Sequence, residues 1–331
     1  MQTQNLKIIS TLGPSSLNPK FIKMVNTYQQ SHFRLNFSHL SIKQLVRYLN
    51  FVEKHPSKIP PIYYLDLPGK KIRIGGLKNP ILLKNEAEVE FIPGDLSEHE
   101  QISLPSETFF KVIEANDVVL LQDGSIKMKV ISTSRSQCRA KVIRGGKLRS
   151  KAGVRVENKN LKSDDGSGPS FRMLKMAEKR KINYLALSYV TVPSEITDLQ
   201  KTCADLSYFP KIIAKIEHPL ALDHLEAISE TADEIWYCRG DLGTFISPAE
   251  LSRWQDQTIK IAKKHRKPII IAGQVFQYLT DHSTPTRTEV VHFMKLIEAG
   301  VNGIVLSDET AIGKNSEEAV EAVFSLLKDM A

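Results

Sequence analysis

The sequence lacks several features that mark whole classes of protein. Its 331 residues include three cysteines, Cys138, Cys203 and Cys238, which form no Cys-x-x-Cys pair. An odd, unpaired set of cysteines argues against a disulfide framework and a zinc site, and favours a reducing compartment. No apolar run reaches the roughly 18 residues that a membrane-spanning helix needs. The segment after Met1 has no secretory signal pattern, so we expect a cytoplasmic protein.

Two further signatures are missing. No glycine-rich dinucleotide fingerprint follows the first predicted strand, at residues 6–13. The net charge is +8, and much of the excess lies between Arg139 and Lys181, where aromatic residues are sparse. Because no RNA-reading signature accompanies this basic stretch, we expect no nucleic-acid partner. A solvated basic face, or a field that attracts phosphate substrates, fits the charge better.

Strand-like and helix-like segments alternate through most of the chain. Short apolar runs typical of buried strands occur at residues 6–13, 33–39, 62–67, 183–189, 211–217, 234–242, 267–274 and 302–309. Helical spacing occurs at residues 19–28, 42–52, 194–206, 220–229, 249–265, 287–299 and 317–330. Eight such strands that alternate with helical segments predict an α/β fold, a closed (β/α)8 TIM barrel. A doubly wound open sheet is the competing architecture, and the missing fingerprint counts against it.

The alternation breaks after the third predicted strand. Short runs of alternating apolar and polar residues follow, punctuated by Gly, Pro and Asp. Residues 118–122 and 125–131 flank an Asp-Gly pair, which is a favoured tight turn and predicts a β-hairpin. We therefore predict a small antiparallel β-barrel domain at residues 75–158, inserted into a catalytic barrel made of residues 1–74 and 159–331. Such an insertion is a plausible lid over a site that must exclude water.

Charged residues stand where two neighbouring predicted strands end. Lys215 and Glu217 close one strand, and Arg239 and Asp241 close the next. In a barrel of this kind the carboxyl ends of the strands carry the chemistry. Two carboxylates beside a lysine suit a divalent cation, Mg2+ or Mn2+, and an anionic substrate, whereas two unrelated surface ion pairs are the alternative. Other polar residues share the strand-end position: Thr11, Arg34, Asn36, Ser38, Asp66, Gln274, Ser307 and Glu309.

Seven short motifs stand at these strand ends or in adjoining loops. They are Thr11–Ser16, Arg34–His39, Leu187–Val190, Lys215–Glu217, Arg239–Gly243, Pro285–Glu289 and Leu306–Ala311. In this order they resemble the pyruvate kinase family along nearly the whole chain. The resemblance implies a phosphotransferase that converts phosphoenolpyruvate and ADP to pyruvate and ATP. It also implies a short form without the family's C-terminal regulatory domain, and hence a monomer or a homodimer through barrel helices.

The resemblance gives each matching residue an expected role. Glu217 and Asp241 are expected to bind Mg2+ or Mn2+, and Lys215 to neutralise the transferring phosphoryl group and the enolate. The backbone N–H groups of Gly240 and Asp241 are expected to hold the substrate carboxylate. The remaining roles are phosphate contacts by Arg34 and Arg73, nucleotide contacts by Thr11, Asn36, His39 and Arg73, and a proton relay to the enolate by Ser307 and Glu309.

The third-strand motif departs from the family pattern. Between Asp66 and Arg73, Lys71 stands where many members have a glutamate, and Leu67 stands where they have a threonine. Both family residues are associated with a bound K+ ion. An ammonium group can supply the positive charge that the ion supplies, so we expect Lys71 to serve catalysis and the activity to be independent of K+. A plain surface lysine is the alternative.

A second departure is Gly273, which stands where the family has a threonine that bonds the substrate carboxylate and helps to protonate the enolate. Losing such a hydrogen bond costs about 1–3 kcal/mol. Either a water replaces the hydroxyl or the space takes a larger ligand, and restoring threonine is expected to raise the rate only in the first case. The loop at residues 151–158 also lacks a second lysine, Thr191 replaces an arginine, and the usual Asp and Asn are missing from residues 290–295.

The sequence leaves three functions open. The first is a minimal pyruvate kinase. The second is a barrel enzyme with the same metal–enolate core but another outcome, such as a lyase, a decarboxylase or transfer to another acceptor. The third is a non-catalytic relative. Joint retention of the charged site residues argues against the third, because a non-catalytic protein has no need of Lys215, Glu217, Asp241, Arg34 and Arg73 together.

Overall fold

The computed structural model describes residues 6–28, 30–37, 40–55, 57–69, 72–97, 101–122, 124–157, 159 and 169–328. The chain divides into two compact units, one made of Met1–Pro68 with Pro169–Ala331 and one made of Gly69–Gly168. Within the described ranges, no helix is both long enough and apolar enough to cross a membrane.

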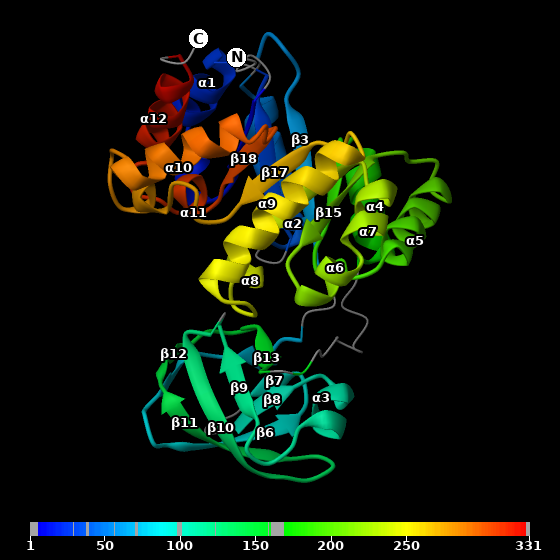
Figure 1. Cartoon of the computed structure of the whole chain (residues 1–331), viewed down its shortest axis with the longest axis vertical. Coiled ribbons are helices and arrows are strands. Elements are labelled where there is room, and N and C mark those ends of the chain that lie inside the picture. The colour runs from blue at the N-terminus through cyan, green and yellow to red at the C-terminus, as the bar shows by residue number, and fades with distance from the viewer. Residues whose placement is uncertain are drawn as a thin grey trace. The chain divides into compact units, whose positions relative to one another are not determined.

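The first unit is built on a closed barrel of eight parallel strands (Figure 1). In barrel order the strands are β1 (Lys7–Thr11), β18 (Gly303–Leu306), β17 (Ile269–Ala272), β16 (Glu234–Cys238), β15 (Lys211–Ile216), β14 (Tyr184–Leu187), β3 (Ile62–Leu67) and β2 (His32–Asn36). Each predicted strand is present, so the predicted TIM barrel is confirmed and the open-sheet alternative is wrong.

Helices connect the strands and cover the barrel (Figure 1). They are α1 (Pro19–Tyr28), α2 (Ile42–Glu53), α4 (Phe171–Lys179), α5 (Pro193–Ala204), α6 (Pro219–Asp223), α7 (Leu225–Thr231), α9 (Pro248–Lys264), α10 (Arg287–Glu298) and α12 (Ser316–Lys328). Capping boxes fix the starts of α2, α9 and α10, because Ser41, Ser247 and Thr286 each accept from the backbone three residues on.

Several predicted boundaries were wrong. The predicted strands at 234–242 and 302–309 each run into a short helix, α8 (Arg239–Leu242) and α11 (Asp308–Ala311). Their charged residues lie in these helices because a strand buried on both faces cannot continue through them. Helix α4 was not predicted, and the single helix expected at 220–229 is divided between α6 and α7 at His224.

The strands place alternate residues inside and outside the barrel. On β15, Ile213 belongs to the cluster inside the barrel, whereas Ile212, Ala214 and Ile216 pack in the core shared with the helices. Because side chains in a strand alternate with a period of two, Lys215 lies on the same face as Ile213. The apolar residues therefore pack on both faces of the strand, and Lys215 lies inside the barrel near its carboxyl end.

The second unit contains a six-stranded sheet in the order β13 (Val154–Val156), β9 (Val118–Leu121), β10 (Ile126–Thr133), β11 (Cys138–Arg144), β6 (Glu88–Pro93) and β8 (Gln101–Leu104). Two-stranded pairs join β12 (Gly146–Leu148) to β5 (Ile81–Leu83), and β4 (Gly76–Leu77) to β7 (Leu96–Ser97). A helix that was not predicted, α3 (Glu107–Val112), lies between β8 and β9.

The predicted hairpin in this unit is present, since β9 pairs antiparallel with β10 and Leu121 lies opposite Ile126. Two pairs differ from the expected antiparallel arrangement, because β6 runs parallel to β8 and β4 runs parallel to β7. The assignment of residues 75–158 to an inserted β-barrel domain stays a prediction.

A half-buried histidine at the amino end of the barrel contacts a buried tyrosine. His32 Nδ1 lies 2.9 Å from the hydroxyl of Tyr64, which is fully buried. Burial and the nearby ammonium of Lys7 lower the pKa of His32 to about 4. The imidazole is therefore neutral in the folded barrel, whereas it takes up a proton near pH 6.5 in an unfolded chain.

We expect this histidine to make the barrel less stable in acid. Its folded pKa lies below its unfolded pKa, so its contribution is present above pH 6.5 and is lost as the pH falls toward 4. Urea unfolding should show a loss of about 2–3 kcal/mol between pH 7 and 4.5 from this residue alone. The His32→Gln variant removes the titration, so wild type and variant should differ in pH dependence within this window; parallel pH profiles would contradict the assignment.

Candidate active site

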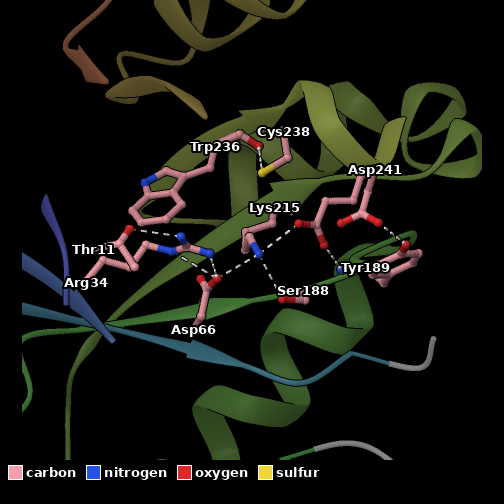
Figure 2. A network of polar contacts seen from close by, with 10 residues as sticks. Thr11, Arg34, Asp66, Ser188, Tyr189, Lys215, Trp236, Cys238 and Asp241 are labelled. Atoms are coloured by element: carbon pink, nitrogen blue, oxygen red, sulfur yellow. Dashed lines mark hydrogen bonds and ion pairs between the residues drawn. The ribbon is translucent and has the colours of Figure 1, made fainter. Parts of the chain in front are cut away.

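Asp66 lies at the centre of a buried polar network at the carboxyl ends of the barrel strands (Figure 2). Its Oδ2 accepts hydrogen bonds from Nε and Nη2 of Arg34, the first at 3.1 Å. It also accepts from Nζ of Lys215 at 3.0 Å. Nη1 of Arg34 donates to Oγ1 of Thr11 at 3.1 Å. Side chains from β2 and β15 therefore meet at one carboxylate on β3, and Arg34 extends the network to β1.

Lys215 makes three polar contacts, which matches the three N–H groups of an ammonium. Besides its bond to Asp66, it donates to Oγ of Ser188 at 3.0 Å and forms an ion pair with Oε1 of Glu217 at 2.8 Å. Ser188 directly follows β14, and Glu217 directly follows β15. Lys215 is only 6% exposed and Glu217 only 3%. These contacts are therefore shielded from solvent, which strengthens them.

The network sets the protonation states of its members. Burial opposes charge on Lys215, but Asp66 and Glu217 raise the pKa of its ammonium group. Burial also opposes ionisation of Asp66, yet Arg34 and Lys215 hold the pKa of that carboxyl below its ordinary value. Both groups are therefore charged at neutral pH. Glu217 differs, because burial and the nearby Asp241 raise its pKa in spite of the ion pair with Lys215.

Glu217 and Asp241 are joined through a single residue, Tyr189. The backbone N–H of Tyr189 donates to Oε2 of Glu217 at 2.9 Å, and its hydroxyl donates to Oδ1 of Asp241 at 2.8 Å (Figure 2). Asp241 lies in α8, directly after β16, which is the neighbour of β15 in the barrel. The structure thus brings the two predicted carboxylates together, close enough for each to act on the charge of the other.

The donor set fits a hard divalent cation. When Glu217 is ionised, as a metal-binding carboxylate must be, Arg34 and Lys215 carry two positive charges against three negative charges on Asp66, Glu217 and Asp241, which leaves an excess of one negative charge. A divalent cation reverses this excess and makes the site attractive to an anionic substrate. Mg2+ is usually held by one or two carboxylates, with substrate and water completing its shell. Among the described residues, no group of three or more His, Cys, Asp or Glu is placed to hold a metal ion.

Arg239 and Gly273 link the ends of β16 and β17. Nε of Arg239 donates to the carbonyl oxygen of Gly273 at 2.8 Å, and its Nη1 lies 2.6 Å from Nε2 of His292 on α10. Burial and the guanidinium both lower the pKa of His292, so its neutral ring can accept this hydrogen bond. His292 belongs to the segment 290–295 that departs from the family pattern, and it provides the contact to Arg239 there.

Gly273 adopts a backbone conformation that favours glycine. Its φ is +85°, and a Cβ atom added there would lie 3.1 Å from the backbone nitrogen of Gly240. A β-branched residue is strained in this region of φ. This geometry argues against the expectation that restoring threonine raises the rate.

We expect the Gly273→Thr variant to lose stability by about 1–3 kcal/mol, and to lose activity because the Gly240 backbone must shift. Gly124→Thr is a matched control, since Gly124 has a φ of +83° but open space around its Cβ position. Thermal unfolding should show a lower stability in both variants, because threonine is strained at a positive φ. Initial rates should fall only in the Gly273→Thr variant. A Gly273→Thr variant that is faster than the wild type would contradict this account.

Ser307 and Glu309 meet at the end of β18. The backbone N–H of Ser307 donates to Oε2 of Glu309 at 2.6 Å. Burial raises the pKa of Glu309, so its carboxyl group holds a proton to higher pH than an exposed one. Oγ1 of Thr310 donates to the carbonyl oxygen of Thr11 at 3.0 Å, which ties α11 to β1. A buried carboxyl with a raised pKa suits the predicted proton relay.

Asn36 and Arg73 belong to different units of the chain. Asn36 ends β2, in register with the β3 carboxylate at the centre of the network. Arg73 lies in the 69–168 unit, where its Nη1 donates to the carbonyl oxygen of Lys151 at 3.1 Å. Two other predicted site residues, His39 and Lys71, lie outside the described residues.

Sequence reasoning assigned no role to Ser188, Tyr189 or Cys238. Ser188 and Tyr189 follow β14 within a matching motif, so their strand-end position was an available signal. Cys238 ends β16, where burial raises the pKa of its thiol and its Sγ donates to the carbonyl oxygen of Trp236 at 3.6 Å. A cysteine in an apolar strand gives no functional signal, because free cysteine is a common core residue.

The fold and the network define a TIM-barrel protein with a charged site at the carboxyl ends of its strands. A family model of the pyruvate kinase barrel domain matches residues 3–320, and the chain belongs to the pyruvate kinase family. Pyruvate kinases from Thermotoga maritima and Thermococcus litoralis are 28% and 30% identical to it, over 98% and 99% of this chain and 71% and 70% of their own. The crystal structure of pyruvate kinase from Pyrobaculum aerophilum gives a TM-score of 0.83 at 26% identity, covering 98% of this chain and 73% of that one.

These comparisons confirm the family that the seven motifs predicted. Proteins related over nearly the whole of this chain carry the name pyruvate kinase, which denotes a phosphotransferase. Of the three functions left open by the sequence, the comparisons therefore favour the phosphotransferase over the lyase-type enzyme and the non-catalytic relative.

Proposed function

We propose that this chain transfers the phosphoryl group of phosphoenolpyruvate to ADP and so forms pyruvate and ATP. The observation that carries the proposal is the buried contact of Lys215 with Glu217 at 2.8 Å, beside the neighbouring carboxylate of Asp241. Phosphoryl transfer depends mostly on positioning and charge stabilisation. The ammonium group of Lys215, held beside two carboxylates that can bind a metal ion, supplies both.

Lys215 is proposed to face the negative charge on the transferring phosphoryl group and on the enolate oxygen. All three of its polar contacts are with protein acceptors, so a substrate oxygen has to displace one of them. Glu217 is the acceptor that also serves as a proposed cation ligand, so we expect the Lys215–Glu217 ion pair to give way. Asp66 then keeps the ammonium aimed at the substrate. Mg2+ or Mn2+ bound by Glu217 and Asp241 supplies positive charge that polarises the substrate oxygens.

Arg34 is proposed to bind a phosphate oxygen, for which a planar guanidinium is well suited. Its bonds to Asp66 and Thr11 hold it in place before substrate arrives, which lowers the cost of reorganisation during the reaction. The other proposed roles are phosphate and nucleotide contacts by Arg73, substrate carboxylate binding by the backbone of Gly240, Asp241 and Gly273, nucleotide contacts by Thr11, Asn36 and His39, and proton relay by Ser307 and Glu309.

The activity is expected not to require K+. We propose that Lys71 supplies the positive charge that the monovalent ion supplies in relatives with a glutamate at this position. Initial rates should therefore be the same in potassium and in tetramethylammonium salts of equal ionic strength. The Lys71→Glu variant removes the ammonium and is expected to gain a K+ requirement. A strict K+ requirement of the wild type would refute the proposal.

A coupled assay that follows pyruvate formation from phosphoenolpyruvate tests the function. Turnover that needs both ADP and Mg2+ supports it. Absence of ADP-dependent turnover, together with binding of Mn2+ and oxalate, would favour the lyase-type alternative instead. In line with the sequence predictions, we also propose a cytoplasmic monomer or homodimer through barrel helices, with no nucleic-acid partner.

A further inference from the structure

Tyr189 combines a rare backbone conformation with contacts to both predicted metal ligands. Its φ is +58°, in the left-handed region that bulky side chains seldom adopt. Such strain persists where the surrounding structure fixes it, and it is common at functional sites. In this conformation the backbone N–H reaches Glu217 while the hydroxyl reaches Asp241 (Figure 2). One residue therefore constrains both carboxylates.

The aromatic ring of Tyr189 is itself held in place. Its centroid lies 6.4 Å from that of His218, which is buried and packs edge-on against Phe245 at 4.6 Å. The preceding residue, Ser188, accepts the hydrogen bond from Lys215. The contact with His218 restricts the ring of Tyr189, and the bond from Lys215 to Ser188 restricts the loop. Together they fix the direction of the hydrogen bond from the Tyr189 hydroxyl to Asp241.

We propose that Tyr189 is a positioning residue for the divalent cation. Its hydroxyl fixes the carboxylate of Asp241 while its backbone N–H fixes that of Glu217, so the two ligands are held at one spacing before a cation binds. This inference rests on the proposed role of Glu217 and Asp241 as cation ligands. Partners that hydrogen-bond a metal ligand set its orientation, and their loss typically weakens metal binding about 10–100-fold.

The Tyr189→Phe variant tests this role, because it keeps the ring and the backbone N–H and removes only the hydroxyl. Binding of Mn2+ alone, measured by electron paramagnetic resonance without substrate, should weaken about tenfold. The Mn2+ concentration that gives half-maximal activity should rise by a similar factor, while kcat at saturating Mn2+ stays close to the wild-type value. Tyr278→Phe is the matched control, since Tyr278 lies partly exposed on η3 (Gln277–Thr280) and should leave Mn2+ binding unchanged.

Mn2+ affinity that is unchanged or tighter in Tyr189→Phe would overturn the proposal. A lower thermal stability with unchanged Mn2+ affinity would do the same, since that result indicates packing alone. The outcome is separable from the proposed function. If the wild type binds Mn2+ but does not phosphorylate ADP, the proposed function fails, whereas a tenfold loss of Mn2+ affinity in the variant still supports the role of Tyr189.

Discussion

Replacing Lys215 by methionine is expected to lower kcat for ADP phosphorylation by roughly 10³-fold or more, because even one lost donor at a site of developing charge typically costs 10²–10³-fold. The ammonium is buried and held by Asp66, Ser188 and Glu217. Methionine has a similar length but cannot donate a hydrogen bond or carry charge. Single-turnover measurement of pyruvate formation from phosphoenolpyruvate, ADP and Mg2+ checks the effect on the chemical step.

The variant also leaves the carboxylate of Glu217 without its ion pair. Whether the variant protein is folded must therefore be measured separately. Circular dichroism and Mn2+ binding measure this, and Mn2+ binding should persist because Glu217 and Asp241 remain. Lys211→Met is the matched control, since Lys211 is an exposed lysine on the same strand, β15. Its turnover should equal that of the wild type. A folded Lys215→Met protein with wild-type turnover would show that Lys215 has no role in phosphoryl transfer.

Replacing Asp241 by asparagine is expected to weaken Mn2+ binding by about 100-fold or more, since it removes the charge of a direct ligand and not only a supporting contact. Asparagine keeps the shape of the side chain, and its oxygen can still accept from the hydroxyl of Tyr189. The loss should therefore come from charge more than from rearrangement. Titration of Mn2+ by electron paramagnetic resonance gives the affinity directly, without any need for turnover.

Two controls accompany this variant. Asp256→Asn removes an exposed carboxylate from α9 and should leave Mn2+ affinity unchanged. Glu217→Gln should weaken Mn2+ binding as Asp241→Asn does, because both carboxylates are proposed to bind one ion. If one of the two substitutions abolishes Mn2+ binding while the other leaves it intact, the shared site is wrong.

The barrel could be predicted from the sequence because each strand is a short apolar run that ends on polar residues. The run at 211–217 illustrates this: Ile212, Ile213 and Ala214 are buried on both faces, and Lys215 and Glu217 follow at the carboxyl end. The start of α9 was predicted to within one residue, and a capping serine, Ser247, marks it. The capping serines of α3 and α4, Ser106 and Ser170, were not recognised, so these helices were missed. The charged tails of two strands were assigned wrongly, because a four-residue helix has too short a pattern to be read.

The order of the strands was enough to place the two predicted metal ligands, Glu217 and Asp241, at neighbouring strand ends. The hydrogen bonds that link them could not be predicted. The link through Tyr189 depends on a left-handed backbone that no sequence pattern of this kind indicates. Asp66 was recognised only as one polar residue at a strand end, although the structure makes it the centre of the network. Its importance comes from side-chain contacts across β2, β3 and β15, which spacing along a chain does not encode.

The positive φ of Gly273 decides between two outcomes that the sequence left open for the threonine substitution. The sequence shows that a hydroxyl is missing, whereas the structure shows that its return meets a strained backbone 3.1 Å from Gly240. Both conclusions concern the same residue, but only the second includes the conformation that the residue must adopt.

The most direct test of the central claim is a crystal structure of the protein soaked with Mn2+ and oxalate, a mimic of the pyruvate enolate. We predict one anomalous Mn2+ peak bonded to a carboxylate oxygen of Glu217 and to one of Asp241, with Nζ of Lys215 within hydrogen-bond distance of an oxalate oxygen. A Mn2+ peak that contacts neither carboxylate, or a Lys215 side chain directed away from the oxalate, would contradict the account.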